Sequence, residues 1–129
     1  MSAESSLRAA LLAAPAVSAL VGTRVYPMLL PQNPTLPAIV FQRISAVPDH
    51  LLGEQGWRAP CRVQLSLWAA TYDAMRTLTI AVEAALRGYS GSGLRLVRLL
   101  NLTDDYEPET KLYRMIADFR VIPEEGVSA

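Results

Sequence analysis

Four carboxylates near the C-terminal end are the densest group of potential metal ligands in the chain. Asp104, Asp105, Glu107 and Glu109 fall within six positions, and carboxylate oxygens are the ligands that hard cations prefer. The stretch lacks the glycine and the regular spacing of a calcium-binding loop, so we expect no metal here. Three interpretations stay open: a solvated hairpin tip, a contact with a partner, or a wall facing DNA, where like charge keeps a polyanion from adhering.

The other residues with catalytic potential form no recognisable set. His50 is the only histidine, and it has no second His or Cys with which to bind a metal. Ser45 and Ser66 lack the Gly-x-Ser-x-Gly context of a hydrolase nucleophile. The glycine-rich run 88–93 follows an expected helix, whereas a phosphate loop precedes one, because the anion must meet a helix N-terminus. The sequence therefore predicts no catalytic residue, cofactor or metal, and a protein that is not an enzyme.

A strand that runs into a helix is the clearest structural pattern. Residues 61–69 alternate apolar and polar side chains, which indicates a half-buried strand with Cys61 in the core and Trp68 on the other face. From Thr71 the apolar residues recur at helical spacing, and Gly88 ends the run. The expected core positions of this helix are Met75, Leu78, Val82 and Leu86. A single cysteine rules out an internal disulfide.

Similar patterns mark the remaining elements. A first helix is expected over residues 5–14, and Pro15 ends it or starts a second turn that closes at Gly22. A short extended piece over 24–26 leads into a loop, and further strands are expected over 38–45, 94–104 and 111–122. Residues 48–60 read as a polar loop, and 107–110 as a turn that contains Pro108. This order predicts an α+β fold: a single sheet of about four strands, mainly antiparallel, with an N-terminal helix and one long helix packed on one face. We expect one domain over residues 1–129, frayed from about residue 123.

Composition and charge are those expected of a compact protein that binds partners. The 129 residues are 51% hydrophobic and 19% charged, no apolar run is long enough to span a bilayer, and no signal peptide is expected. Formal net charge is zero. Through residue 100 nine basic and five acidic residues give +4, whereas three basic and seven acidic residues after it give −4. Opposite charge on one small subunit suits head-to-tail contacts in a ring.

Three short motifs resemble a known family. Val21-Gly22-x-Arg24-Val25-Tyr26-Pro27 is followed by Leu36-Pro37-Ala38-Ile39-Val40, and the strand of residues 61–69 ends in Trp68-Ala69 before a helix rich in Ala, Leu and Val. This order is similar to that of the small tail-completion proteins of long-tailed phages, which include tail terminators and their gene-transfer-agent relatives. The resemblance covers most of the chain up to about Leu86.

The resemblance implies a structural function. It suggests a homohexameric ring that caps the tail tube, binds the tube protein and the head-tail connector, and contacts DNA only in passage through the channel, with no membrane partner. Such a protein would reside in the neck of a virion or phage-like particle, after assembly in the cytoplasm of the producing bacterium. The alternative is a small cytosolic α+β ligand-binding domain or enzyme, which would need a pocket with convergent polar groups.

Several residues are candidates for subunit contacts. Trp57, in the loop 48–60, is expected either to fold back on the core rim of its own subunit or to contact a partner, because tryptophan is costly to expose and is enriched in binding hot spots. Trp68 should lie on the sheet face opposite Leu65 and Leu67, either under a second layer or against a neighbouring subunit, and Arg43, Arg62 and Gln64 are expected to share that face. The expected interface residues are Leu51, Leu52, Trp57, Arg58, Arg62 and Trp68. The acidic turn of Asp104, Asp105, Glu107 and Glu109 is expected to face the channel or a neighbouring subunit.

Overall fold

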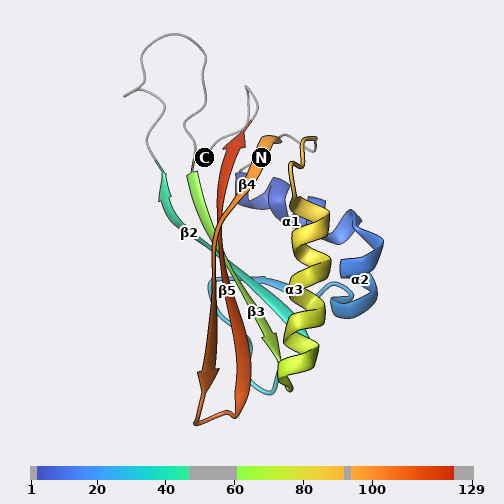
Figure 1. Cartoon of the computed structure of the whole chain (residues 1–129), viewed down its shortest axis with the longest axis vertical. Coiled ribbons are helices and arrows are strands. Elements are labelled where there is room, and N and C mark those ends of the chain that lie inside the picture. The colour runs from blue at the N-terminus through green and yellow to red at the C-terminus, as the bar shows by residue number, and fades with distance from the viewer. Residues whose placement is uncertain (1–2, 47–60, 92–93, 124–129) are drawn as a thin grey trace.

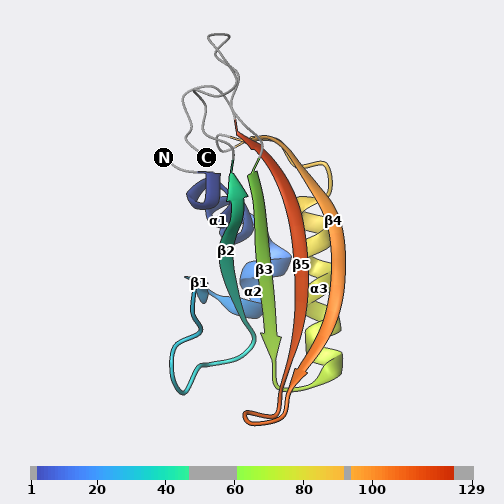
Figure 2. The ribbon, with the colours of Figure 1, turned by 90° about the vertical axis from the view of Figure 1, so that its left-hand side faces the viewer.

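A five-stranded sheet carries all three helices on one face, in a computed structural model that describes residues 3–46, 61–91 and 94–123 (Figure 1). Figure 2 looks onto the opposite face, which no helix covers. In chain order the elements are α1 (Ala3–Ala13), α2 (Pro15–Val21), β1 (Val25–Pro27), β2 (Ala38–Ala46), β3 (Cys61–Ala69), α3 (Tyr72–Leu86), β4 (Leu94–Glu107) and β5 (Leu112–Pro123).

The strand order is β1-β2-β3-β5-β4. β1 pairs with β2 in parallel, and every other neighbouring pair is antiparallel. β3 and β4 therefore run in the same direction on either side of β5, and α3 makes the crossover between them. The predicted α+β fold is confirmed. The structure adds β1 as a fifth strand and gives residues 15–21 a helix of their own.

The strand and helix read from residues 61–86 are confirmed in their bounds and in their buried faces. Cys61 is 2% exposed, and the predicted core positions of α3 are each exposed by 1% or less. The Thr71 hydroxyl accepts a hydrogen bond from the Ala74 N–H at 3.1 Å, which satisfies one of the free donors at the start of α3. Within the described residues, no helix has the length and apolar character needed to cross a membrane.

The motifs of residues 21–27 and 36–40 hold β1 against the rest of the sheet. Gly22 follows α2 with φ of +59°, a conformation that glycine adopts readily. Arg24 then donates from Nε to the Pro37 carbonyl and from Nη2 to the Leu20 carbonyl, both at 3.0 Å. Val25 and Ile39, which pair across β1 and β2, are almost fully buried. These residues thus have a structural role: they join the end of α2 to the start of β2.

Candidate assembly surfaces

The open face of the sheet carries polar side chains that the strand register arranges in rows. Arg62, Gln64 and Trp68 alternate with buried residues of β3, so the prediction that they share this face is confirmed. The prediction for Arg43 is wrong, because Arg43 pairs with Val63 and therefore lies on the face that carries the helices. Apolar residues stand at both odd and even positions of β2, so the alternation of the sequence could not show which side chains lie on which face of the sheet.

Trp68 packs within its own subunit at the lower end of this face. The Arg114 guanidinium lies 5.1 Å from the centre of the Trp68 ring, and its Nη2 donates to Asp105 Oδ2 at 2.9 Å. Trp68 also borders a hollow of about 400 Å³ between the β1–β2 loop and the end of the β4–β5 hairpin, where Leu30 and Glu107 are among the lining residues. Trp68 is half-buried. Because the Arg114 guanidinium contacts both Trp68 and Asp105, a positive charge lies beside the acidic turn.

Three arginines form a row at the other end of the open face. Arg62 pairs with Arg120 across β3 and β5, and Arg120 pairs with Arg98 across β5 and β4. Directly paired residues on neighbouring strands are about 5 Å apart, and like charges at that spacing repel. Asp118 lies 3.4 Å from Arg62, but Arg98 and Arg120 have no ion-pair partner within the described part of the chain. This arginine row is therefore a place where an external anion would be stabilised.

The acidic turn lies at the tip of the β4–β5 hairpin, far from the arginine row. Asp104, Asp105 and Glu109 are exposed and Glu107 is half-buried. The Lys111 N–H donates to the Glu107 carbonyl at 2.8 Å and closes the turn. In the described residues, no three His, Cys, Asp or Glu side chains converge in a group that could hold a metal ion. The sheet thus has an acidic lower end and a basic upper end.

Leu51, Leu52, Trp57 and Arg58 lie outside the described residues, as does His50. Their predicted part in subunit contacts stays a prediction.

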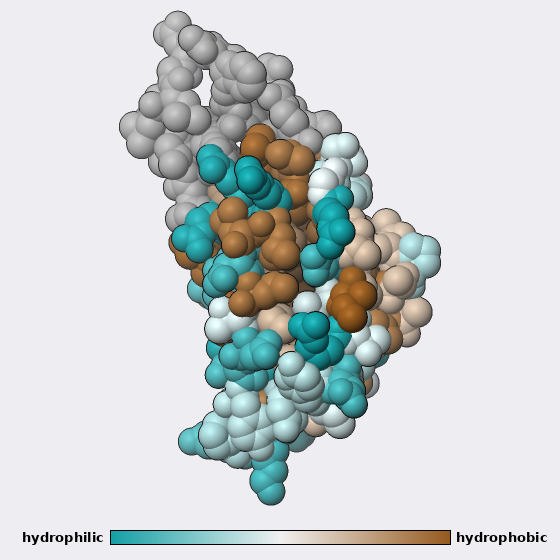
Figure 3. Space-filling view, viewed as in Figure 1, coloured by the Kyte–Doolittle hydropathy of each residue, from teal (hydrophilic) through white to brown (hydrophobic). Residues whose placement is uncertain are grey.

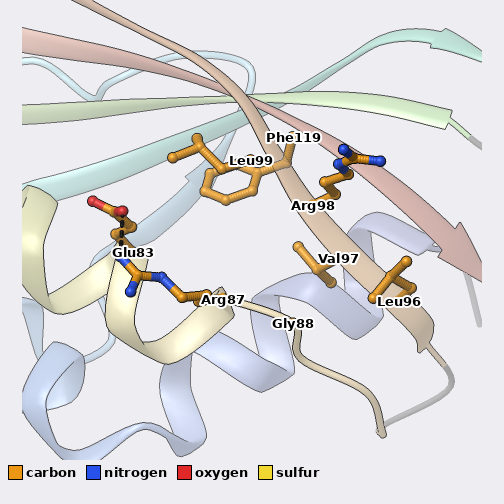
Figure 4. Close-up of a pocket in the computed structure, with 8 residues that line it drawn as sticks. All are labelled: Glu83, Arg87, Gly88, Leu96, Val97, Arg98, Leu99 and Phe119. Carbon is orange, nitrogen blue, oxygen red and sulfur yellow. Dashed lines mark hydrogen bonds and ion pairs between the residues drawn. The ribbon is translucent and has the colours of Figure 1, made fainter.

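An apolar hollow lies between the C-terminal end of α3 and the edge strand β4 (Figure 4). Its volume is about 400 Å³, and its lining consists of Glu83, Arg87, Gly88, Leu96, Val97, Arg98, Leu99 and Phe119. Glu83 and Arg87 form an ion pair at 2.6 Å on one side of it. Figure 3 shows apolar side chains gathered over the upper part of β4, where Leu96 is 37% and Leu100 is 45% exposed. We call this site the α3–β4 hollow.

Two further apolar side chains project at the opposite edge of the sheet. Met28 is 60% and Leu29 is 78% exposed, directly after β1. Neither this exposed pair nor the α3–β4 hollow was predicted from the sequence. An apolar run such as Met28-Leu29-Leu30 indicates burial, and only the folded arrangement shows that two of its members point outward.

Charged and apolar side chains thus gather at the margins of the sheet. The profile of the tail completion protein gp17 family matches residues 5–124, so the chain belongs to that family. One solved structure of similar fold is a chain of the virion of a native gene transfer agent (GTA) particle, with a TM-score of 0.73 and 20% identity over 94% of this chain and 93% of that chain. No curated protein matches the chain.

Family membership confirms the resemblance that the sequence motifs indicated. The chain is a tail completion protein, a structural component of a phage or phage-like particle. The family is a structural one, in agreement with the prediction that this chain is not an enzyme.

Proposed function

We propose that this protein is a tail terminator: it forms a homohexameric ring that caps the tail tube and joins it to the head connector. The whole chain, residues 1–129, acts as one domain in this ring. The observation that supports the proposal most is the separation of charge along the sheet. The arginine row and the acidic turn lie at opposite ends of one subunit, so they can meet only between subunits, and repeated head-to-tail contacts close into a ring when the rotation allows.

The particle would be a phage or a gene-transfer-agent-like particle, because a virion of the latter kind contains a chain of the same fold. The protein would assemble in the cytoplasm of the producing bacterium and reside in the neck of the finished particle. Its direct partners would be further copies of itself, the tail tube protein and the head-tail connector, with DNA only in passage.

The acidic turn has two possible positions in such a ring. If Asp104, Asp105, Glu107 and Glu109 line the channel, their charge prevents the passing genome from adhering. If they face arginines of the next subunit, they stabilise the ring itself. The two arrangements differ in their response to salt, because screening weakens attraction and repulsion alike. Ring stability should fall with added salt in the second case, and hold or rise in the first.

The loop residues Leu51, Leu52, Trp57 and Arg58, together with Arg62 and Trp68, are the proposed contact residues. Replacing Trp57 with Ala should leave the melting temperature of the monomer unchanged while weakening ring formation or tail joining, because hot-spot aromatics contribute about 2 kcal/mol or more to binding. Ile80→Ala is the control, since Ile80 is an exposed apolar residue in the middle of α3, away from the acidic turn.

Size-exclusion chromatography with light scattering, over a range of protein concentrations, tests the proposal. A mass of six chains that forms with rising concentration, or on addition of assembled tail tubes, is the expected result. A protein that stays monomeric at all concentrations and leaves tubes uncapped in electron micrographs would refute the terminator function.

A further inference from the structure

We infer that Leu29 of one subunit docks into the α3–β4 hollow of a second copy of this chain. The inference rests on the proposed ring and specifies which two surfaces of the subunit make its contact. Each subunit carries both surfaces, at opposite edges of its sheet (Figure 2). Leu29 follows β1, which is the first strand in the sheet order, and the hollow borders β4, which is the last.

The chemistry of the α3–β4 hollow suits an aliphatic side chain. Leu99 and Phe119 pair across β4 and β5 and lie together in the lining (Figure 4). Gly88 leaves one wall open, because a Cβ atom there would have no neighbour within 4 Å. The charged groups of the lining, Glu83, Arg87 and Arg98, belong to exposed or half-exposed residues. An apolar floor with a charged rim is the arrangement found at the centre of protein interfaces.

Leu29 is presented in a way that suits insertion. Its side chain is 78% exposed, although its backbone N–H donates to the Pro27 carbonyl at 2.7 Å. The preceding Met28 has φ of +67° and donates its N–H to the Phe41 carbonyl at 2.9 Å. A left-handed conformation is uncommon for a residue other than glycine. These hydrogen bonds tie the segment to the sheet and leave the leucine pointing outward, so docking requires little further ordering.

Charge complementarity identifies the occupant as a second copy. Leu30, next to Leu29, lines the hollow beside Trp68 together with Glu107 of the acidic turn, so the segment that carries the projecting leucine reaches the acidic end of the subunit. The α3–β4 hollow has Arg98 in its lining, and Arg98 is a member of the arginine row. Docking of Leu29 into the hollow therefore brings an acidic end toward a basic one. Because the two surfaces differ, each copy can offer both, and the contact is head-to-tail.

Cysteine trapping tests the contact in the full chain. One variant carries Leu29→Cys and a second carries Leu96→Cys, at the mouth of the hollow. Each is oxidised mildly alone, then in an equimolar mixture, and a chain with both substitutions is oxidised in parallel. The unsubstituted protein controls for Cys61, which is buried. Tyr72→Cys mixed with Leu29→Cys is the matched control, because Tyr72 is similarly exposed at the other end of α3.

We expect disulfide-linked dimers in the mixture of the two variants at a level at least tenfold above the Tyr72 control. Each single variant should stay uncrosslinked, and the doubly substituted chain should give a ladder that ends in a closed species. Crosslinking at the control level, or a Leu29→Cys dimer formed by one variant alone, would overturn the contact. If rings form by light scattering without this crosslink, only the inferred contact is wrong. If the crosslinked ladder grows into open filaments, the contact stands and the ring is wrong.

Discussion

Replacing Leu78 with Ala is expected to destabilise the subunit strongly. Leu78 is 0% exposed in the middle of α3, and it belongs to the core cluster that the helices form with the sheet. Truncation removes most of an apolar side chain from a site closed on every side, so the loss of burial is joined by a cavity. Leu→Ala changes of this kind lower the free energy of unfolding by about 2–5 kcal/mol.

This loss is large relative to the whole stability of a small domain, which is about 5–15 kcal/mol. For a chain of 129 residues, each kcal/mol lowers the melting temperature by roughly 3–5 °C. We therefore expect Leu78→Ala to melt about 6–25 °C below the wild type. Circular dichroism at 222 nm, read against temperature, measures this shift directly.

Ile80→Ala is the matched control for this prediction. Ile80 lies on the same helix, but its side chain is 60% exposed, and substitutions at exposed positions change stability by about 0.5 kcal/mol or less. Its melting curve should nearly overlay that of the wild type. Equal shifts in the two variants, or no shift in Leu78→Ala, would show that the burial pattern of α3 has been assigned wrongly.

Three further changes probe contacts elsewhere in the fold. Thr71→Ala removes the oxygen that accepts the Ala74 N–H and should lower the free energy of unfolding by about 1 kcal/mol in urea denaturation. Arg24→Ala leaves the Leu20 and Pro37 carbonyls without their donor, and a loss of about 1–3 kcal/mol is expected by the same assay; an unchanged midpoint would mean that water replaces the guanidinium. Asp105→Asn breaks a partly exposed ion pair with Arg114, so its effect should stay below about 1 kcal/mol and vanish in high salt.

The strand and helix of residues 61–86 could be predicted because their period is visible along the chain. Apolar residues alternate from Cys61 and then recur at helical spacing to Leu86, and each period matches one buried face in the structure. Periodicity could not identify β1 as a strand of the sheet, because three residues are too few to show a period. Its pairing with β2 is supported by the hydrogen bond from Arg24 Nε to the Pro37 carbonyl, which joins residues that are 13 positions apart in sequence.

The surfaces were harder to predict than the fold. Arg62, Arg98 and Arg120 are widely separated in sequence and become a row only through the register of three strands. The residues that line the α3–β4 hollow are also separated in sequence, because they belong to α3, β4 and β5 and come together only in the folded chain. The acidic turn could be seen in advance because its four carboxylates are neighbours in the chain itself.

Cryo-electron microscopy of the neck of the assembled particle tests the central claim most directly. The account predicts one closed ring of six copies between the tail tube and the connector, with the acidic turn at the channel or against the next subunit. A neck that lacks this chain, or a ring in which the acidic turn lies on the outer rim and touches neither channel nor neighbour, would contradict it.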